Sequence, residues 1–378
     1  MSGRSSPLEG VTVLDLGQIY NGPYAGFLMA MAGARVIKVE PRDGESLRHR
    51  TLIGGAALPF AMLNSNKLAV TLNLKSARGR ELLIEMVRRA DVLLENFVPG
   101  AMERLGVGYE VLREANPRLI YASGSGFGRS GPYRDYPAMA VCDFVCGTHL
   151  FGAVTTALYE REKTGRGQLI EVAMLEAVYF SLSSSLGLYF GSGSYGGPIR
   201  FPQRTGNRHP GHAAAPYSVY RAADGYITIL CVNNAHWKSL LKAMGREDLR
   251  EDGRFETPKN RAAHGEEVDE IVGAFAARFG RDELYELLLK HRVPCAPVRD
   301  LAEVTNDAHL HARGMLEWME HPQYGRIAAA RSPLRFEGVA PTRLAPSAAL
   351  GQHNAEVYCG WLGLSPSELE QLQREEVI

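Results

Sequence analysis

The first 125 residues alternate between short apolar runs and helix-forming segments, and this alternation limits the possible folds of the chain. The apolar runs span residues 11–16, 34–40, 70–74, 91–95 and 118–122. A small, apolar helix at 24–33 with Pro23 at its first turn follows the first run, and an amphipathic helix at 79–90 follows the third. Strands joined by helical crossovers pair in parallel. The pattern therefore predicts an α/β fold with a mainly parallel sheet.

The pattern changes after residue 190. A long apolar helix is expected at 148–161, a strand at 169–173 and a helix at 174–189. Residues 191–216 contain six Gly and four Pro and read as a linker. A second unit follows, with a strand at 226–232 and helices near 235–244, 265–279 and 281–292, and after Val298 the pattern is irregular. Ser365 and Pro366 then mark the start of a C-terminal helix.

Charge and cysteine usage exclude several classes of protein. The chain has 42 basic and 42 acidic residues among 378, so it lacks the basic surplus of proteins that coat nucleic acid or anionic membranes. Its five cysteines form no CxxC pair, which disfavours a disulfide framework or a structural zinc site. No signal-peptide core or membrane-spanning apolar run is present. We expect a cytoplasmic protein without a metal and without nucleic-acid or membrane partners.

Ligand-binding residues are expected where parallel strands end, because open α/β sheets bind ligands there. Four such ends are visible, at residues 17–21, 41–44, 96–100 and 123–128. The glycine-rich stretch 124–128 does not spell GxGxxG and no helix follows it directly, so it is weak support for an NAD-dependent dehydrogenase. P-loop, HExxH and GxSxG motifs do not occur.

Asp143 is an acid in an otherwise apolar run, AVCDFVCGTHLFGAV. Two readings stay open from the residues alone: a helix cap, which the local pattern favours, or a nucleophile that attacks a thioester and forms a covalent intermediate. Cys142 and Cys146 flank it four residues apart and read as small packed residues, while His149 reads as a core histidine rather than a catalyst.

Several segments together resemble the class III CoA-transferases, the family of formyl-CoA:oxalate and carnitine CoA-transferases. They are PLEGVTVLDL, GARVIKVEPRDGES, NSNKLAVTLNLK, DVLLENFVPGAMERLG, NPRLIYASGSGFGRSGPY, Asp143 followed by TGRGQ, RTGN with APY, VPCAPV and LGQHNAEV. They span nearly the whole chain in a specific order. ENF-x-PG and the spacing from Asp143 to TGRGQ are the most diagnostic.

The resemblance implies a Rossmann-like large domain with a mainly parallel sheet, plus a smaller α+β domain, in an interlocked dimer. The large domain would begin with residues 1–190, followed by a linker at 191–216 and the small domain at 217–310. Residues 311–378 would be a linker and return to the large domain. The implied activity moves CoA from an acyl-CoA donor to a carboxylic acid acceptor through an aspartyl-CoA thioester, with CoA as substrate and no permanently bound cofactor.

The resemblance also implies residue roles. The family's nucleophile falls on Asp143, and a family arginine falls on Pro41, with Arg42 beside it. Arg42, Lys75 and Arg104 are the candidate partners of CoA phosphates, and for each one alone the alternative is a solvated surface charge, which is the better default. The full set of implied CoA contacts is Tyr20, Asn21, Arg42, Leu72, Asn73, Leu74, Lys75, Asn96, Phe97, Val98, Arg104, Tyr136, Pro137, Ala138 and Met139.

The chain departs from the family pattern at two places. A polar, glutamine-containing and lid-like segment expected before the catalytic Asp is missing, so that Met139 runs directly into Ala140. The segments on both sides of this point match the family well. This favours the interpretation that an internal stretch was left out of the sequence over a natural deletion. The family's glycine-rich loop is replaced by HPGHAAAPY at 209–217, which argues against formyl/oxalate chemistry.

Two related functions remain as alternatives. An α-methylacyl-CoA racemase shares the fold, but its histidine would fall around 137–140, where Pro-Ala-Met-Ala stands. A non-catalytic CoA-binding or scaffold protein is the other alternative, since a segment near Asp143 is missing.

Overall fold

The computed structural model describes residues 4–49, 58–134, 140–193 and 214–378. The chain divides into two compact units, which are described separately. Unit 1 comprises Met1–Phe180 and Asp307–Ile378, and unit 2 comprises Ser181–Asn306. The chain therefore leaves the first unit, builds the second, and returns to the first.

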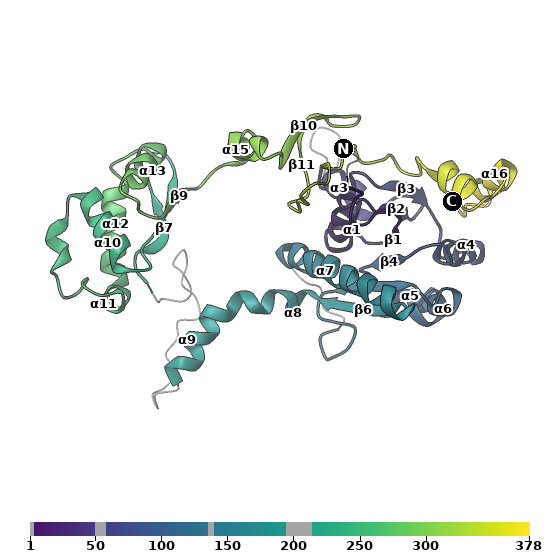
Figure 1. Cartoon of the computed structure of the whole chain (residues 1–378), viewed down its shortest axis with the longest axis horizontal. Helices are drawn as coiled ribbons and strands as arrows, with labels where there is room; N and C mark the ends of the chain where they lie inside the picture. Colours follow the sequence, from purple (N-terminus) through teal and green to yellow (C-terminus); the bar gives the residue numbers. More distant parts are fainter. Residues whose placement is uncertain (1–3, 50–57, 135–139, 194–213) are drawn as a thin grey trace. The chain divides into compact units, whose positions relative to one another are not determined.

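A six-stranded parallel sheet forms the centre of unit 1 (Figure 1). Its order is β3-β2-β1-β4-β5-β6, so the direction of winding reverses between β1 and β4. The predicted fold class is confirmed for this unit. The strands are β1 (Thr12–Asp15), β2 (Arg35–Glu40), β3 (Leu68–Thr71), β4 (Val92–Glu95), β5 (Ile120–Ser125) and β6 (Gln168–Ala173).

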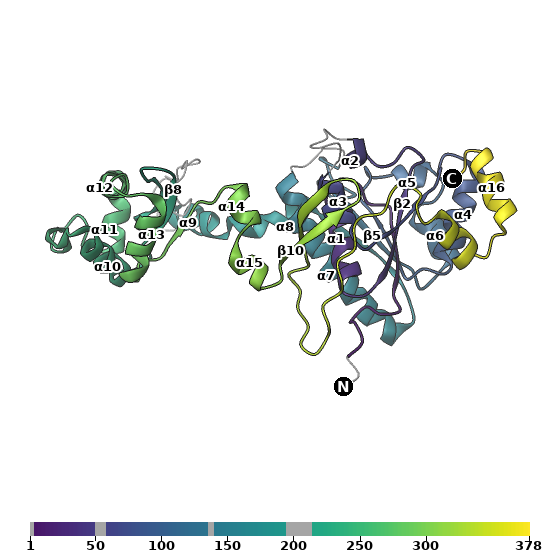
Figure 2. The same ribbon diagram turned by 90° about the horizontal axis from the view of Figure 1, so that it is seen from above.

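Alternate residues of the strands pack into two different helical layers. Val13 packs with α1 (Asn21–Met31) and α7 (Ala140–Thr164) on one face of the sheet. Leu14, one position later, packs on the other face with α4 (Ala77–Val87) and α6 (Tyr109–Ala115). Side chains alternate between the faces of a strand, so both faces of this sheet are covered. Strands β1 to β5 are mostly buried, whereas the edge strand β6 is largely half-buried or exposed. Figure 2 shows the same sheet from above.

The outer edge of β3 is covered by the last part of the chain. Asn354 Oδ1 accepts a hydrogen bond of 3.0 Å from the Thr71 N–H, and the Tyr358 hydroxyl donates one of 2.7 Å to the Thr71 carbonyl. Tyr358 belongs to a π-helix, η3 (Ala355–Trp361), and α16 (Pro366–Arg374) follows it with the predicted Ser365 cap. These contacts satisfy the polar groups of an edge strand that would otherwise be open to pairing.

The remaining elements of unit 1 are short. The expectation of irregular structure after Val298 is wrong, because β10 and β11 form an antiparallel hairpin in that part of the chain. The hairpin has one exposed face, so its apolar periodicity is weak. The elements are α2 (Ser46–His49), α3 (Leu58–Asn64), α5 (Ala101–Arg104), α8 (Met174–Tyr179), α15 (Ala308–Ala312), β10 (Leu316–His321) and β11 (Gly325–Ala330).

Unit 2 packs helices around a three-stranded antiparallel sheet of order β7-β8-β9. The fully buried Arg261 donates 2.8 Å and 3.0 Å hydrogen bonds to the Phe255 carbonyl and Asn234 Oδ1, and its guanidinium lies 5.2 Å from the Trp237 ring centroid. The elements are η1 (Phe180–Leu182), at the boundary with unit 1, α9 (Ser183–Gly193), β7 (Tyr217–Arg221), β8 (Tyr226–Leu230), α10 (Asn234–Met244), η2 (Glu247–Arg250), α11 (Pro258–Ala263), α12 (Gly265–Ala276), α13 (Arg281–Lys290), β9 (Cys295–Pro297) and α14 (Leu301–Thr305).

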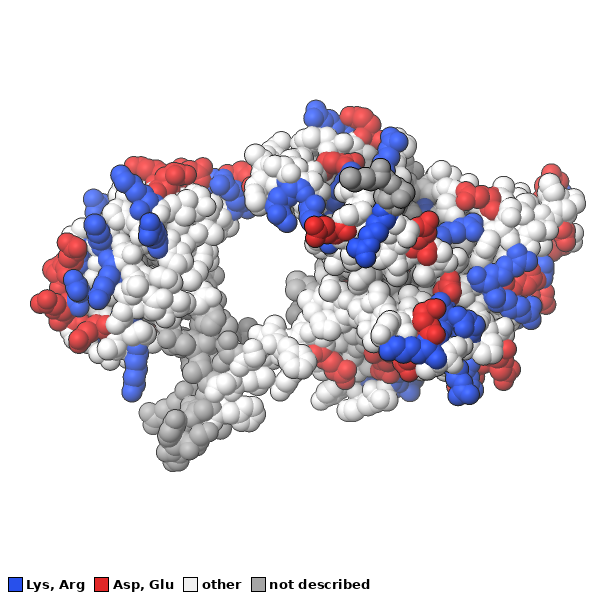
Figure 3. Space-filling model, in the orientation of Figure 1, with Lys and Arg blue, Asp and Glu red and all other residues white. Residues whose placement is uncertain are grey.

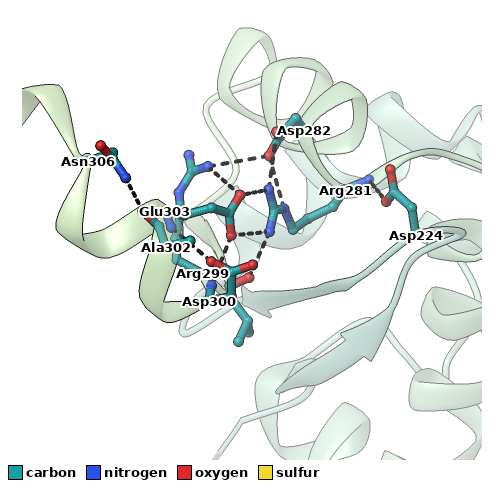
Figure 4. Close-up of polar contacts among 9 residues, drawn as sticks. Asp224, Arg281, Asp282, Arg299, Asp300, Ala302, Glu303 and Asn306 are labelled. Carbon is teal, nitrogen blue, oxygen red and sulfur yellow. Dashed lines mark hydrogen bonds and ion pairs between the residues drawn. The ribbon is translucent and has the colours of Figure 1, made fainter. Parts of the chain in front are cut away.

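Arg281 anchors the segment by which the chain leaves unit 2 (Figure 4). Its guanidinium donates to Glu303 Oε2 at 2.8 Å and to the Val298 carbonyl at 3.0 Å. The Arg281 main-chain N–H donates to Asp224 at 2.6 Å. The Arg281 hydrogen bonds lower the pKa of Glu303 to about 2. The contacts thus tie α13 to the start of α14.

Positive and negative side chains are interspersed over the face drawn in Figure 3, in keeping with a net charge of zero. Among the described residues, no helix has the length and apolar content to cross a membrane.

Candidate active site

A cavity of about 490 Å³ opens at the carboxyl ends of β1 and β2 in unit 1. Its lining comes from four loops that follow β1, β2, β3 and β4, together with the ends of these strands. Cavities of this size hold cofactor-sized ligands. The lining residues are Leu16, Gly17, Gln18, Lys38, Val39, Glu40, Pro41, Arg42, Asp43, Glu45, Leu72, Asn73, Leu74, Lys75, Phe97 and Leu105.

The loop after β1, residues 17–20, lies between this cavity and Asp143, and buried side chains hold its first half. Asp15 Oδ1 accepts a 2.8 Å hydrogen bond from the Gly17 N–H, and Lys38 donates to the Gly17 carbonyl. Asn96 accepts from the Gln18 N–H at 2.6 Å and donates to the Gln18 carbonyl at 2.9 Å. The amide of Asn96 is therefore engaged with the loop, across the point where the sheet reverses its winding.

The second half of the loop contains a strained residue. Ile19 has a φ of 62°, in the left-handed region that costs non-glycine residues about 1–2 kcal/mol. Its main-chain N–H donates a 2.9 Å hydrogen bond to Glu45 Oε2. Glu45 is 1% exposed, and burial raises its pKa against the lowering effect of Lys38. Its other oxygen, Oε1, has no hydrogen-bond partner among the described residues.

The loop ends at Asn21, whose main-chain N–H interacts with the carboxylate of Asp143 and lowers its pKa. Asn21 is the first residue of α1, and Asp143 lies in the first turn of α7. Asp143 is 8% exposed, and burial raises its pKa to about 6, with the Asn21 hydrogen bond acting in the opposite direction. The carboxylate is thus buried, yet ionised in most molecules at pH 7.

The environment of Asn21 is crowded, and two glycines make the approach possible. A Cβ at Gly124 would lie 2.7 Å from Asn21 Nδ2, and one at Gly147 would lie 2.8 Å from the Asn21 carbonyl. Asn21 Nδ2 also donates to Cys146 Sγ at 3.1 Å. Gly124 is the last but one residue of β5. Its missing side chain leaves room for Asn21, and it does not belong to a nucleotide-binding loop.

The other candidates near Asp143 have ordinary surroundings. The structure contradicts the cap interpretation of Asp143, because α7 begins three residues earlier and the main-chain N–H that interacts with the carboxylate belongs to α1. His149 is exposed, and its ring nitrogen bonds to the Val145 carbonyl of its own helix at 2.8 Å. Cys146 is buried and Cys142 is half-buried.

The cavity brings together only part of the predicted CoA contacts. Those that line it are Arg42, Leu72, Asn73, Leu74, Lys75 and Phe97. Tyr20, Asn21, Asn96, Val98 and Arg104 are not among its lining residues. The fully buried Asn21 and the engaged Asn96 shape the loop, while Tyr20 stacks on Phe144 with ring centroids 5.5 Å apart. Tyr136, Pro137, Ala138 and Met139 lie outside the described residues.

The two candidate arginines differ in their surroundings. Arg42 forms a 3.0 Å ion pair with Glu376 at the cavity rim. Arg104 donates to the Pro99 carbonyl at 3.4 Å, while the neighbouring acids Glu103 and Glu110 pair with other arginines. Its guanidinium therefore has no acid partner among the ion pairs of the described residues.

A buried ion pair between Lys67 and Asp15 lies against the start of α1. Lys67 Nζ lies 2.7 Å from Asp15 Oδ2 and donates to the Pro23 carbonyl at 2.8 Å and to Asn64 Oδ1 at 2.9 Å. Burial lowers the pKa of Lys67 to about 8, against the raising effect of Asp15. The side chain of Lys67 is 1% exposed, so this pair is part of the core.

The structure combines a buried carboxylate, a short loop and a cofactor-sized cavity lined by the start of that loop. Comparison with known proteins shows the family of the chain. The model of "CoA-transferase family III" matches residues 8–141 and 136–354. The chain belongs to CoA-transferase family III. Formyl-CoA:oxalate CoA-transferase of Streptomyces avermitilis is 35% identical, with 98% of this chain and 99% of the relative covered.

Two further proteins are similar to this chain over more than nine-tenths of its length. Succinyl-CoA–D-citramalate CoA-transferase of Chloroflexus aurantiacus is 32% identical, with 98% of each chain covered. The crystal structure of a CAIB/BAIF family protein from Brucella suis is 30% identical, has a TM-score of 0.80, and is matched over 94% of this chain and 100% of that chain. The chain is thus an enzyme of the class III CoA-transferases with the fold of its solved relatives.

The family model matches this chain in two segments instead of one, and the break between them falls beside Asp143. Its two segments overlap at residues 136–141, and the alignment with the Streptomyces relative extends over 412 positions although this chain has 378 residues. The relatives therefore have residues without a counterpart here. The interruption falls where the sequence lacks the segment typical of the family, between Met139 and Ala140.

Proposed function

We propose that the chain transfers CoA from an acyl-CoA to a carboxylic acid through a covalent aspartyl-CoA intermediate on Asp143. The supporting observation is the Asp143 carboxylate itself, which is buried and held by the Asn21 N–H. With a pKa of about 6 it is mostly ionised at pH 7, and poor solvation leaves it reactive.

One carboxylate is sufficient for all steps of this proposal. Asp143 attacks the thioester carbonyl, the C–S bond breaks, and CoA thiolate leaves behind an acyl-aspartyl anhydride. The thiolate attacks the aspartyl carbonyl, which releases the first acid and forms aspartyl-CoA. The acceptor carboxylate then attacks this thioester, and the released thiolate attacks the acceptor's carbonyl in the new anhydride. The products are the new acyl-CoA and free Asp143.

The cavity is the proposed CoA site. Leu72, Leu74 and Phe97 offer apolar surface for the adenine ring and the pantetheine methylenes. Lys75 and Arg42 are the proposed phosphate ligands among the lining cations, because the third, Lys38, donates to the Gly17 carbonyl. Arg104, which has no acid partner within the described parts of the chain, follows the same strand end as Phe97 and is the third proposed phosphate ligand. The loop 17–20 leads from this cavity to Asp143, the path proposed for the thiol end.

Covalent trapping tests the proposal. Wild-type protein incubated with acyl-CoA and hydroxylamine is expected to carry a hydroxamate on Asp143, seen by peptide mass spectrometry. Asp143→Ala should lose transfer by more than 1,000-fold, since removing a nucleophile raises the barrier by several kcal/mol. Cys142→Ala is the matched control, because it removes the neighbouring half-buried thiol and should retain both transfer and trapping. Transfer that persists in Asp143→Ala would reject the mechanism.

Succinyl-CoA is the proposed donor, and a small dicarboxylic acid is the proposed acceptor. The curated relatives are named for formyl-, acetyl- or succinyl-CoA and for oxalate, citramalate, malate or glutarate, all of which are dicarboxylic acids. A panel of these donors against these acceptors, with product acyl-CoAs read by mass, identifies the pair.

We also propose a cytoplasmic homodimer. Aromatic side chains along residues 175–190 are exposed, with Phe180 at 80% and Phe190 at 64%, and this stretch is mostly uncharged surface in Figure 3. Soluble monomers rarely expose such a run, and a second copy of the chain is the occupant we propose. The five free cysteines of the chain fit a reducing compartment, which supports the proposed cytoplasmic location. A monomer by light scattering at micromolar concentration would reject the dimer.

A further inference from the structure

We propose that Glu45 is a positioning residue for CoA transfer, which fixes the strained Ile19 and thereby directs the Asn21 N–H at Asp143. The inference rests on the proposed function, because it concerns how the nucleophile is held. Glu45 does not contact Asp143, and it acts through the main chain of the loop 17–20.

The first observation is the division of contacts along the loop. Asp15, Lys38 and Asn96 hold Gly17 and Gln18, the two residues next to the sheet. The contact on Ile19 comes from Glu45, at 2.9 Å, from a different loop that follows β2. Glu45 therefore controls the half of the loop that leads into Asn21.

The second observation is the backbone conformation of Ile19. A β-branched residue at a φ of 62° relaxes to negative φ unless its surroundings oppose the change. Such a rotation would turn the peptide planes that precede Asn21. The hydrogen bond to Glu45 opposes it, so the orientation of the Asn21 N–H depends on a side chain that follows another strand.

The third observation is that Glu45 is itself held firmly. Its main-chain N–H donates to Glu40 Oε2 at 3.2 Å, and Glu40 is fixed by a two-pronged pair with Arg48 at 2.7 and 2.8 Å. Glu45 is almost completely buried, and one of its oxygens has no partner among the described residues. A buried acid with an unsatisfied oxygen is unfavourable for stability alone. The contact with Ile19 gives this buried acid a role beside the cavity.

Four variants separate positioning from a general structural role: Glu45→Ala, Glu45→Gln, Ile19→Gly, and Glu45→Ala combined with Ile19→Gly. Glutamine keeps a carbonyl oxygen for the Ile19 N–H but carries no charge. Glycine adopts positive φ without strain, so it removes the need for the contact. Each variant is assayed for kcat and KM with the most active pair of the substrate panel. Thermal melting is recorded, and deuterium uptake of the peptide that covers residues 17–24 is measured on the ligand-free protein.

We expect Glu45→Ala to lower kcat at least 10-fold, to change KM for the acyl-CoA less than threefold, and to raise deuterium uptake in residues 17–24 selectively. Glu45→Gln should stay within about threefold of wild type. The double variant should recover most of the kcat lost in Glu45→Ala, and Ile19→Gly alone should have near-normal kcat.

Unchanged uptake in residues 17–24 of Glu45→Ala overturns the proposal whether or not a donor is turned over. A wild-type kcat in Glu45→Ala, or a double variant no better than Glu45→Ala, also overturns it. A loss accompanied by lower melting temperature and raised uptake throughout the sheet assigns Glu45 a structural role instead. Asp143→Ala reports separately on the proposed function, since that variant keeps the contact between Glu45 and Ile19 and is judged by its loss of transfer and of covalent trapping.

Discussion

The main-chain N–H of Asn21, in the first turn of α1, interacts with the carboxylate of Asp143, in the first turn of α7, and lowers the pKa of that carboxyl group. The N-terminus of a helix favours negative charge, so α1 stabilises the ionised form of Asp143. Burial opposes this effect and is the larger influence, so the pKa rises to about 6. The acid is thus ionised near neutral pH without being well solvated.

Transfer activity should follow the ionisation of Asp143. The carboxylate is the proposed nucleophile and its pKa is about 6, so kcat/KM should rise about 10-fold per pH unit below pH 6 and level off above pH 7. Initial rates between pH 4.5 and 8 at constant ionic strength check this. A flat profile over this range would contradict the assignment of Asp143.

Asp143→Asn should stabilise the protein at pH 8 by about 1–2 kcal/mol, at about 1.4 kcal/mol per pKa unit less a lost hydrogen bond. The folded-state pKa of about 6 exceeds the usual value of 3.8. The stability contributed by the acid is therefore complete below pH 3.8 and lost as the pH rises through 6. The variant should gain little at pH 4. Urea unfolding at both pH values measures the difference, and equal effects at the two would disagree with the raised pKa.

CoA should bind to the ligand-free protein, and NAD should not. Arg104→Ala should weaken CoA binding by about 1–3 kcal/mol, the scale of a charge-assisted hydrogen bond. Arg42→Ala should weaken it less, because Arg42 must first leave its ion pair with Glu376. Titration calorimetry measures CoA against NAD on the wild-type protein, and CoA affinity in Arg104→Ala and in Arg42→Ala. Equal CoA affinity in Arg104→Ala would leave Arg104 as an ordinary surface charge.

Lys67→Met should destabilise unit 1 by about 3–5 kcal/mol, because it leaves the Asp15 carboxylate buried without its partner. Adding Asp15→Asn to this variant should recover part of the loss, since the uncompensated charge is then removed. Denaturant unfolding of the three proteins checks the order. A double variant less stable than Lys67→Met would contradict this explanation.

Much of the fold could be predicted from the sequence, because the central strands of the parallel sheet are buried on both faces. Val13 and Leu14 both pack in cores, so the run 11–16 is continuously apolar and easily recognised. The hairpin of β10 and β11 escaped prediction because its strands mix exposed and buried positions. Strand β7 was not predicted, because it lies directly after the Gly- and Pro-rich stretch that was interpreted as a linker.

The candidate site was only partly predictable. Strand ends predicted the cavity, and Arg42, Lys75 and Phe97 do line it. The resemblance assigned Asn96 to CoA, but a sequence does not show that its amide is engaged with Gln18. Glu45 went unnoticed because its importance comes from a contact with Ile19, 26 positions away, and from burial. Its only sequence signal is an acid directly after the β2 turn, in PRDGES.

The contact between Thr71 and Asn354 has a consequence for the order of events during synthesis. The two residues are 283 positions apart, and at about 5–20 residues per second their synthesis is separated by roughly a quarter of a minute to one minute. Throughout this interval the edge of β3 has no cover on the ribosome, while all of unit 2 emerges and becomes free to fold. The first domain to begin synthesis is therefore the last to be completed, and nascent chains halted before residue 354 should be the ones that need chaperone protection.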